Sequence, residues 1–374
     1  MPKPLLRRFS KFLLVLCNII AVLFFLAGAF VQYFNPAQWW FIGILTLSLP
    51  YILLILILFL LLWLFSRSLW VFLSIITISI AWGEVENIIP FNFSSTFTLQ
   101  KKTNSIRVMS WNVEQFDILQ HKTHPEVKEK MLQLINQFQP DIACFQEMVG
   151  GDDDKAINYL GDIKKKLKFK SYYYSYDVRL DFDKDHHFGI LIFSKFPVLK
   201  RQTISFYPYD YNSIFQYVDV LANTDTIRVF NIHLQSLKFS RSNFQYLDNP
   251  DFKSDSALQK SKNIISKLKR GFLKRSLQSN MIKSEINKSP YPVIVCGDFN
   301  DVPNSYAYSK IGNNMQNAFV EKGAGIGRTF SRISPTLRID NIFIDKNFTI
   351  DQYIRIKKKL IDHYPIIADI TANK

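Results

Sequence analysis

Cysteine, glycine and acidic residues are all scarce in this sequence of 374 residues. The three cysteines (Cys17, Cys144 and Cys296) all lie inside apolar runs, which excludes a small scaffold held by disulfides and indicates buried thiols instead. Asp and Glu number 31 against 46 Lys and Arg, so the formal net charge is +15. The sequence contains no P-loop, no HExxH and no CxxC motif, and the chemistries that those motifs support are therefore not indicated.

Charge is distributed very unevenly along the chain. Residues 1–100 contain five basic and two acidic residues, which leaves +12 of the net +15 to residues 101–374. The first hundred residues are therefore almost entirely apolar, whereas the remainder has the mixed composition of a basic soluble domain. This division excludes a wholly soluble protein and a disordered chain, and it predicts a membrane segment followed by a large domain.

Three long apolar runs occupy residues 12–31, 41–65 and 68–83. A helix needs about 20 apolar residues to cross the hydrocarbon core of a bilayer; the first two runs reach that length, and the third is shorter. The first run could alternatively be the apolar region of a cleaved signal peptide, but it is too long for that and a second span follows at once. We therefore predict that residues 1–83 form a membrane anchor of three transmembrane helices.

Basic residues at the ends of these runs predict the orientation of the anchor. Four of them precede the first run (Lys3, Arg7, Arg8 and Lys11), and Arg67 lies between the second and third runs. The positive-inside rule places both positions in the cytoplasm. With three spans, the rest of the chain lies on the outer side of the inner (cytoplasmic) membrane. If the third run only lies on the membrane surface, the domain is cytoplasmic instead.

Beyond a polar linker expected at residues 84–104, the domain at residues 105–374 contains short apolar runs typical of strands. Eight runs are predicted as strands, at residues 106–111, 141–146, 188–193, 217–221, 227–232, 293–296, 341–344 and 366–370. Helical spacing of apolar residues predicts helices at residues 125–138 and 154–167. Strands outnumber helices and often follow one another directly, which indicates an α/β domain with mixed or antiparallel sheets.

Polar side chains cluster where the predicted strands begin or end. The clusters are Ser110-Trp111-Asn112, Phe145-Gln146-Glu147, Asn231-Ile232-His233, Cys296-Gly297-Asp298-Phe299-Asn300, Arg338-Ile339-Asp340 and Asp362-His363. One such cluster is ordinary, since strand ends are solvated. Six of them, in a domain whose sheets would gather the strand ends together, indicate an active site.

In chain order these clusters contain the motifs SWN, QE, NIHL, GDFN, RID and DH, and the ordered set resembles the endonuclease/exonuclease/phosphatase superfamily with the DNase I-like fold. The resemblance covers the whole predicted domain. It implies a four-layer α/β/β/α sandwich, in which two β-sheets are flanked by helices and the site lies at one edge. Members of this superfamily include nucleases, sphingomyelinases and inositol-phosphate phosphatases.

Hydrolysis of a phosphodiester needs an activated water, neutralisation of charge on the phosphoryl oxygens and help for the leaving oxygen. A hard cation such as Mg²⁺ (or Mn²⁺) binds through carboxylate and amide oxygens, so we expect Glu147, Asn112 and Asp362 to hold it. A glutamate at a strand end is, in isolation, more often a plain surface residue. The ordered set of motifs is what favours the metal ligand here.

Five further residues are expected to carry the catalytic and phosphate-binding roles. Asp298 can take a proton from the attacking water and Asn300 can bind the phosphate, although an Asx turn would also explain the Gly-Asp-Phe-Asn segment. His363 is expected to donate to the phosphate while Asp340 orients its imidazole. The resemblance implies that His233 is a second phosphate-binding donor, whereas a lone histidine after a strand is usually structural.

The stretch from residue 238 to residue 288 holds twelve Lys and Arg against four acidic residues. Such a face could bind a nucleic-acid backbone or anionic lipid, or could simply be solvated. The leading hypothesis is a membrane-anchored, metal-dependent phosphodiester hydrolase of the nuclease type. The alternatives are a lipid-headgroup phosphodiesterase or phosphatase that resembles sphingomyelinase, and an inactive binding module on the same fold. No obligate protein partner is predicted.

Overall fold

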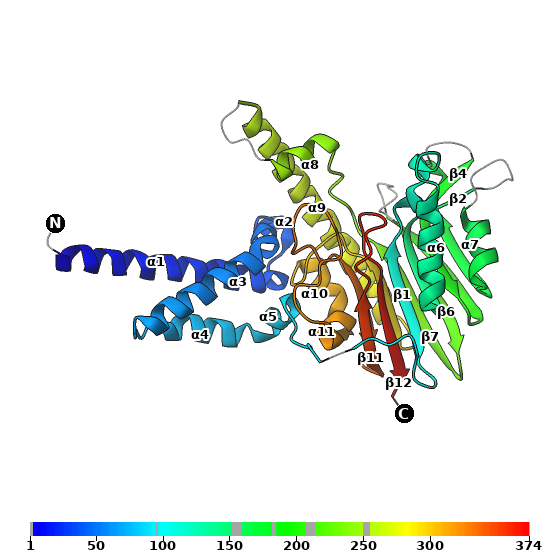
Figure 1. The fold of residues 1–374 in the computed structure, drawn as a ribbon, viewed down its shortest axis with the longest axis horizontal. Helices are drawn as coiled ribbons and strands as arrows, with labels where there is room; N and C mark the ends of the chain where they lie inside the picture. The colour runs from blue at the N-terminus through cyan, green and yellow to red at the C-terminus, as the bar shows by residue number, and fades with distance from the viewer. Residues whose placement is uncertain are drawn as a thin grey trace.

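The computed structural model describes residues 3–94, 96–151, 159–181, 185–206, 214–249 and 255–373. Helices at the N-terminus project from an α/β body that holds both β-sheets (Figure 1). The N-terminal helices are α1 (Lys3–Ala29), η1 (Val31–Tyr33), α2 (Pro36–Trp39), α3 (Ile42–Phe65), α4 (Val71–Ile80) and α5 (Trp82–Ile88). The third predicted apolar run therefore forms α4 and the start of α5.

Two of these helices are long and apolar enough to cross a membrane, α1 from Leu5 onward and α3. Helices α4 and α5 would together make a third span, but they meet at an angle of 76°. Leucine and phenylalanine side chains remain exposed along α1 and α3, for example Leu54 at 54% and Leu58 at 56%. Exposed apolar surface on this scale is what a helix long enough to cross a bilayer would present to lipid.

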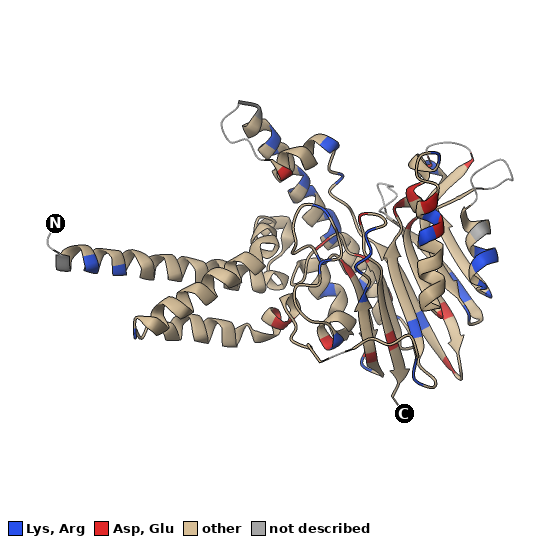
Figure 2. Ribbon diagram, in the orientation of Figure 1, with Lys and Arg blue, Asp and Glu red and all other residues tan. Residues whose placement is uncertain are grey.

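Helix α1 starts at the end farthest from the sheets and runs toward the body (Figure 1). Helix α3 then runs away from the body, and α4 returns toward it. Basic residues colour the start of α1 at that far end, whereas the rest of α1, α3 and α4 is almost free of charge (Figure 2). The body thus lies at the opposite end of the helices from the basic N-terminus. The side of the membrane on which the body lies stays a prediction from the positive-inside rule.

The body contains two six-stranded sheets that pack face to face. The first sheet has the order β11-β12-β1-β2-β4-β3, and the second β5-β6-β7-β8-β10-β9. The strands are β1 (Ile106–Asn112), β2 (Ile142–Gly151), β3 (Ser171–Tyr176), β4 (His186–Ser194), β5 (Val198–Ser205), β6 (Ile214–Ala222), β7 (Asp225–His233), β8 (Val293–Asp298), β9 (Met315–Asn317), β10 (Asp340–Asp345), β11 (Phe348–Arg355) and β12 (Ile366–Ala372). Both sheets are mixed, because β1 pairs with β2 and β7 with β8 in parallel while the other pairs are antiparallel.

All eight predicted strands are confirmed, and they are the eight interior strands of the two sheets. The four strands without a strong sequence signal, β3, β5, β9 and β11, are the four sheet edges. An edge strand has fewer covered neighbours and tolerates polar residues, as the exposed Lys200-Arg201-Gln202 of β5 illustrate. A run of apolar residues therefore predicts the interior strands well and the edge strands poorly.

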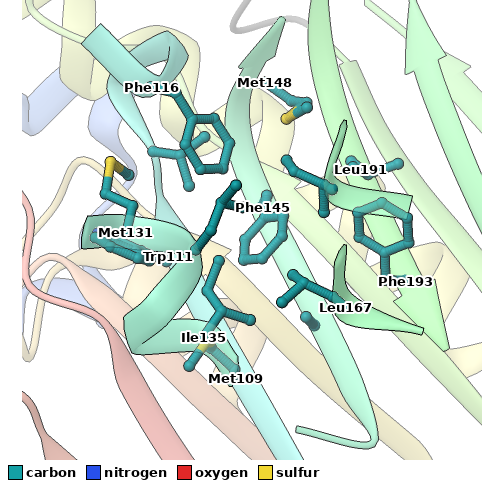
Figure 3. Close-up of a cluster of buried hydrophobic side chains, with 14 of the residues drawn as sticks. Met109, Trp111, Phe116, Met131, Ile135, Phe145, Met148, Leu167, Leu191 and Phe193 are labelled. Carbon is teal, nitrogen blue, oxygen red and sulfur yellow. The ribbon is translucent and has the colours of Figure 1, made fainter. Parts of the chain in front are cut away.

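Helices cover the outer faces of the sandwich, as the predicted four-layer arrangement requires. Helices α6 (Glu126–Phe138) and α7 (Tyr159–Leu167) pack on the first sheet, where Met131, Ile135 and Leu167 meet Phe145 and Phe193 (Figure 3). Helices α9 (Asp255–Asn287) and α10 (Tyr306–Gly312) contribute to the apolar core on the second sheet. The shorter elements are η2 (Glu114–Gln120), η3 (Val178–Leu180), α8 (Arg241–Asp248) and α11 (Ala318–Lys322).

The two helices predicted at residues 125–138 and 154–167 correspond to α6 and α7. Residues 152–158, at the start of the second prediction, lie outside the described residues. The thiols of Cys144 and Cys296 are buried between the sheets, and all three cysteines are free.

The segment that follows the membrane helices is fastened to the body by a buried arginine. Arg338 donates to the main-chain carbonyls of Asn87 and Ile88 at the end of α5 and to that of Ile326, and its guanidinium lies 4.3 Å from the ring centre of Phe319. The last carbonyl groups of a helix have no hydrogen-bond donor within the helix, so Arg338 supplies the donors for the end of α5. The segment expected as a polar linker thus begins in a helix that contacts the body.

Replacing this arginine should loosen the junction between α5 and the body. We expect Arg338→Ala to lower the free energy of unfolding by about 3 kcal/mol, because it leaves several buried carbonyl groups without a donor. Thermal denaturation of the full chain in detergent micelles measures the effect, and proteolysis within residues 89–104 should become faster. Arg201→Ala, on the exposed face of β5, is the matched control and should change neither property. Equal stability of the two variants would contradict this account of the junction.

Candidate active site

Six strands bring polar residues at or beside their ends to one edge of the sandwich. Because β1 is parallel to β2 and β7 is parallel to β8, the ends of these four strands face the same way within each sheet. Strands β10 and β12 run antiparallel to β8 and β1, so Asp340 at the start of β10 and His363 just before β12 reach the same edge. The packing of the two sheets then places all of these side chains around Asp298 at the end of β8.

Asp298 has polar neighbours from both sheets. Asn112 donates its side-chain amide to Asp298 Oδ2 over 3.1 Å, and the backbone N–H of Asn300 donates to Asp298 Oδ1 over 2.7 Å. The Nε2 atoms of His233 and His363 lie 3.7 Å and 3.8 Å from Asp298 Oδ2. The carboxylate therefore lies between two imidazoles, with one amide fixing its orientation.

Glu147 lies beside this group at a break in the sheet. The β2–β4 pairing shifts register between Phe145 and Met148, and Glu147 has a φ of +50°. A bulge of this kind turns a side chain away from its regular direction, and the left-handed backbone costs some free energy. Glu147 Oε1 accepts from Asn112 over 3.2 Å, Oε2 accepts from Gln115 over 2.7 Å, and His233 Nε2 lies 3.6 Å from Oε1.

His363 and Asp340 form a buried pair that joins the two sheets. His363 Nδ1 lies 2.9 Å from Asp340 Oδ2. Burial alone disfavours the imidazolium, but Asp340 and Asp298 outweigh that penalty and raise the pKa of His363 well above its usual value. His363 is therefore charged at neutral pH, and its Nε2 hydrogen faces Asp298.

Burial raises the pKa of several carboxyl groups of the site. Burial, with repulsion from Asp340, raises the pKa of Asp298 to about 7. Burial and the neighbouring Asp362 likewise raise the pKa of Glu114 to about 7. Burial also raises the pKa of Glu147. Such upward shifts mark a place where added positive charge would be stabilising.

The donor set fits a hard divalent cation. Glu147, Asp362 and Glu114 offer carboxylate oxygens and Asn112 an amide oxygen, which are the ligand types that Mg²⁺ and Mn²⁺ prefer. Within the described residues, the potential ligand atoms of Asp298, Asp340 and His363 all lie within 4.8 Å of one another, and this fully buried group could hold a metal ion.

Asn300 and Asp362 complete the set of residues predicted from the sequence. Asn300 has a φ of +48°, and its amide donates to the carbonyl of Leu234 over 2.9 Å. The backbone N–H of Asp362 donates to Glu114 Oε2 over 3.2 Å, and its carboxylate lies 3.5 Å from the guanidinium of Arg332. The structure therefore brings all eight predicted residues to one place. Their catalytic and metal-binding roles stay predictions.

A cleft of about 250 Å³ opens above this group. The predicted residues that line it are Glu147, Asp298, Asn300, Asp362 and His363, whereas Asn112, Asp340 and His233 lie behind them. The ring of Phe330 packs against His363, with 5.0 Å between ring centres. Apolar side chains form much of the remaining wall.

Three residues of this site lie outside the motifs that sequence reasoning used. They are Glu114, Gln115 and Arg332. Glu114 lies two residues after Asn112, the last residue of β1, so its position beside a strand end could have marked it as a candidate site residue. Arg332 lies in an irregular segment with no periodic pattern, and only the folded chain brings it within 3.8 Å of Glu114.

The two stacked sheets and the polar residues at their edge are the fold of phosphodiesterase-type hydrolases. The chain belongs to the endonuclease/exonuclease/phosphatase family, whose model matches residues 109–357. Residues 10–88 match a domain of unknown function (DUF8431). No curated protein matches the chain.

Solved structures share the fold of the body at low sequence identity. D. rerio TDP2 complexed with a single-strand DNA product has a TM-score of 0.51 and 16% identity, over 72% of this chain and 99% of that one. The human Nocturnin catalytic domain with bound sulfate anion has a TM-score of 0.49 and 18% identity, over 76% of this chain and 99% of that one. A family protein from Bacteroides thetaiotaomicron has a TM-score of 0.48 and 16% identity, over 72% of this chain and 98% of that one.

Gly297 precedes Asp298 and packs closely against β7, so replacing it tests whether this position has room for a side chain. Its φ is +155°, and a Cβ at this position would lie 2.0 Å from the carbonyl oxygen of Ile232 on β7. We expect Gly297→Ala to lower the free energy of unfolding by about 3 kcal/mol, since backbone must move to relieve the overlap. Gly83→Ala in α5, where nothing lies within 4 Å, is the control and should leave stability unchanged or slightly higher. Thermal denaturation measures both variants. If Gly297→Ala were as stable as the wild-type protein, the close packing of Gly297 against Ile232 would be contradicted.

Proposed function

We propose that this protein is a membrane-anchored, divalent-metal-dependent phosphodiester hydrolase. The observation that carries the proposal is the position of Asp298, a carboxylate whose pKa burial raises to about 7, between His233 and His363 at the floor of the cleft. A base with a pKa near the working pH is well matched to taking a proton from water. The domain boundaries predicted from the sequence are part of this proposal: anchor 1–83, linker 84–104 and catalytic domain 105–374.

Glu147 and Asn112, with Asp362, are the residues that would hold the cation. When bound there, the cation would neutralise phosphoryl oxygens and stabilise the leaving oxygen. The buried group of Asp298, Asp340 and His363 is the less suitable place. A histidine ligand must be neutral, whereas Asp340 and Asp298 favour the charged form of His363 and its Nδ1 already contacts Asp340.

The remaining residues divide the steps of hydrolysis among them. Asp298 takes one proton from water as the new P–O bond forms and the ester P–O bond breaks. His363, charged and held by Asp340, donates from Nε2 to a phosphoryl oxygen, and Asn300 lines the cleft beside the phosphate. His233, expected as a second phosphate-binding donor, lies behind the cleft wall with its Nε2 beside Asp298 and Glu147. The leaving oxygen takes a proton from the solvent in the cleft. The products are an alcohol and a phosphate monoester.

Removing the carboxylate of Asp298 should abolish turnover. We expect Asp298→Ala in the full chain to reduce cleavage of a small bis-aryl phosphodiester by about 10²–10⁴-fold, the usual contribution of a general base. The assay uses detergent micelles with Mg²⁺ or Mn²⁺, and EDTA should abolish activity. Asp225→Ala is the matched control, because Asp225 is exposed at the opposite end of β7 from His233. Activity that survives both EDTA and Asp298→Ala would refute this mechanism.

Removing the imidazole of His363 should also reduce turnover strongly. We expect His363→Ala to lower kcat by about 10²-fold or more, because a charged donor to the phosphate is lost. Circular dichroism should show that the variant still folds. His124→Ala is the control, since the side chain of His124 is half exposed near α6. Near-normal activity of His363→Ala would remove this residue from the mechanism.

A further inference from the structure

The cleft above Asp298 has two chemically different halves. Its floor is made of carboxylates and His363, as described above. Its walls carry apolar side chains from several separate parts of the chain, among them Leu47, Phe239, Phe244, Leu268, Ile333 and Leu337. A free phosphate or a small polar ester has no apolar group to pack against these walls. A hydrocarbon chain would bury apolar surface against them.

One wall of the cleft belongs to a membrane helix. Leu47 lies in α3, five residues after the helix begins at Ile42 on the side of the body. At a rise of 1.5 Å per residue, that is about 8 Å along the helix axis. Trp39, Trp40 and Phe41 precede it, and aromatic residues of this kind typically mark the membrane–water interface. The cleft therefore reaches the depth of lipid headgroups and upper acyl chains.

A loop of the body runs along the same helix. The hydroxyl group of Tyr51 in α3 and that of Ser334 lie 2.8 Å apart, so the segment 330–337 extends beside α3 past the level of Leu47. Ile333 at its tip is 39% exposed and has a φ of +64°. A β-branched residue rarely adopts this backbone conformation, and such strain is typical of functional segments. The loop presents an isoleucine where the bilayer surface would be.

The opposite wall is made by α8 and α9, and it approaches the membrane as well. Phe272 of α9 packs against Gly43 of α3, where its ring lies 3.0 Å from the position of an added Cβ. Lys269 of α9 lies 5.4 Å from the ring centre of Trp40. Both walls of the cleft therefore contact α3 or the residues just before it, and Leu47 of α3 borders the cleft between them.

Basic side chains lie beside one wall of the cleft and along α9. Arg332 lies 3.5 Å from Asp362, 3.8 Å from Glu114 and 5.4 Å from the ring centre of Phe244, so it links the loop, the acidic floor and α8. Along α9 the side chains of Lys260, Lys262, Lys269 and Arg270 are exposed. Cations at this position complement the phosphates of an anionic membrane surface.

We propose that the substrate is a membrane phospholipid or sphingolipid that enters the cleft sideways from the bilayer. This inference rests on the proposed hydrolase function and names the substrate class of the same site. The hydrocarbon chain lies against Leu47, Phe244 and Ile333 while the phosphodiester reaches Asp298 and His363. Water adds to phosphorus, the ester P–O bond breaks, and an alcohol and a phosphate monoester are released.

The test compares substrates on the full-length protein reconstituted into vesicles. The vesicles contain phosphatidylethanolamine, phosphatidylglycerol and sphingomyelin, and the soluble substrates are single-stranded DNA, RNA and a bis-aryl phosphodiester, all with Mg²⁺ or Mn²⁺. We expect one of the lipids to be cleaved in preference to the nucleic acids. Leu47→Trp should fill the cleft and lower the lipid rate by about ten-fold more than the rate on the bis-aryl ester.

Leu54→Trp is the matched control, because Leu54 is exposed on α3 and does not line the cleft. This variant should leave both rates unchanged. A second readout uses a phosphatidylcholine with a photoactivatable group in its acyl chain. It should label the segment 330–337 in the wild-type protein, and Leu47→Trp should reduce the labelling.

The outcomes separate the two proposals. Preferential cleavage of nucleic acid, cleavage of the bis-aryl ester without any lipid, or equal effects of the two tryptophan variants would overturn the lipid proposal and leave the hydrolase standing. Absence of photolabelling in the cleft would also overturn it. If not even the bis-aryl ester is cleaved in an Asp298-dependent manner, the hydrolase function itself fails, and the lipid proposal fails with it.

Discussion

Polar contacts between the two sheets at one edge of the sandwich are the constraint on which the site depends. Much of the space between the sheets is apolar. At this edge Gln146 donates to Asn231 over 2.7 Å, Asn112 donates to Asp298 over 3.1 Å, and His363 contacts Asp340 at 2.9 Å, each pair joining one sheet to the other. Buried polar groups are costly unless they are paired, so these contacts fix how the sheets meet and where Asp298 lies.

The same segment of chain connects this edge to the membrane helices. Between residues 326 and 340, Thr329 Oγ1 accepts from the backbone of Asp340 and Ser331 donates to the carbonyl of Asp362. A few residues away, Ser334 contacts Tyr51 of α3 and Arg338 holds the end of α5. The pair formed by Asp340 and His363 is therefore built on a loop that also rests on the membrane part. One continuous segment thus contacts both the candidate site and the N-terminal helices.

The sequence predicted the interior strands because buried strands are nearly continuous in apolar residues, as in Val293–Cys296 of β8. It did not predict the edges: β3 reads Ser-Tyr-Tyr-Tyr-Ser-Tyr and β9 has only three residues. The eight candidate site residues were found because each stands at a strand end and belongs to an ordered set of motifs. Glu114 and Arg332 were not found, because their place in the site depends on loops without periodicity.

By itself the sequence determined a chain with two strongly apolar N-terminal segments and an α/β body with chemistry at its strand ends. Those features depend on local composition and on residue order, which the chain carries before it folds. Only the tertiary structure decided that Leu47 of the apolar helix α3 lines the same cleft as Asp298, 251 residues later in the chain. Contacts between such distant residues follow from the packing of sheets and helices, and no local pattern encodes them.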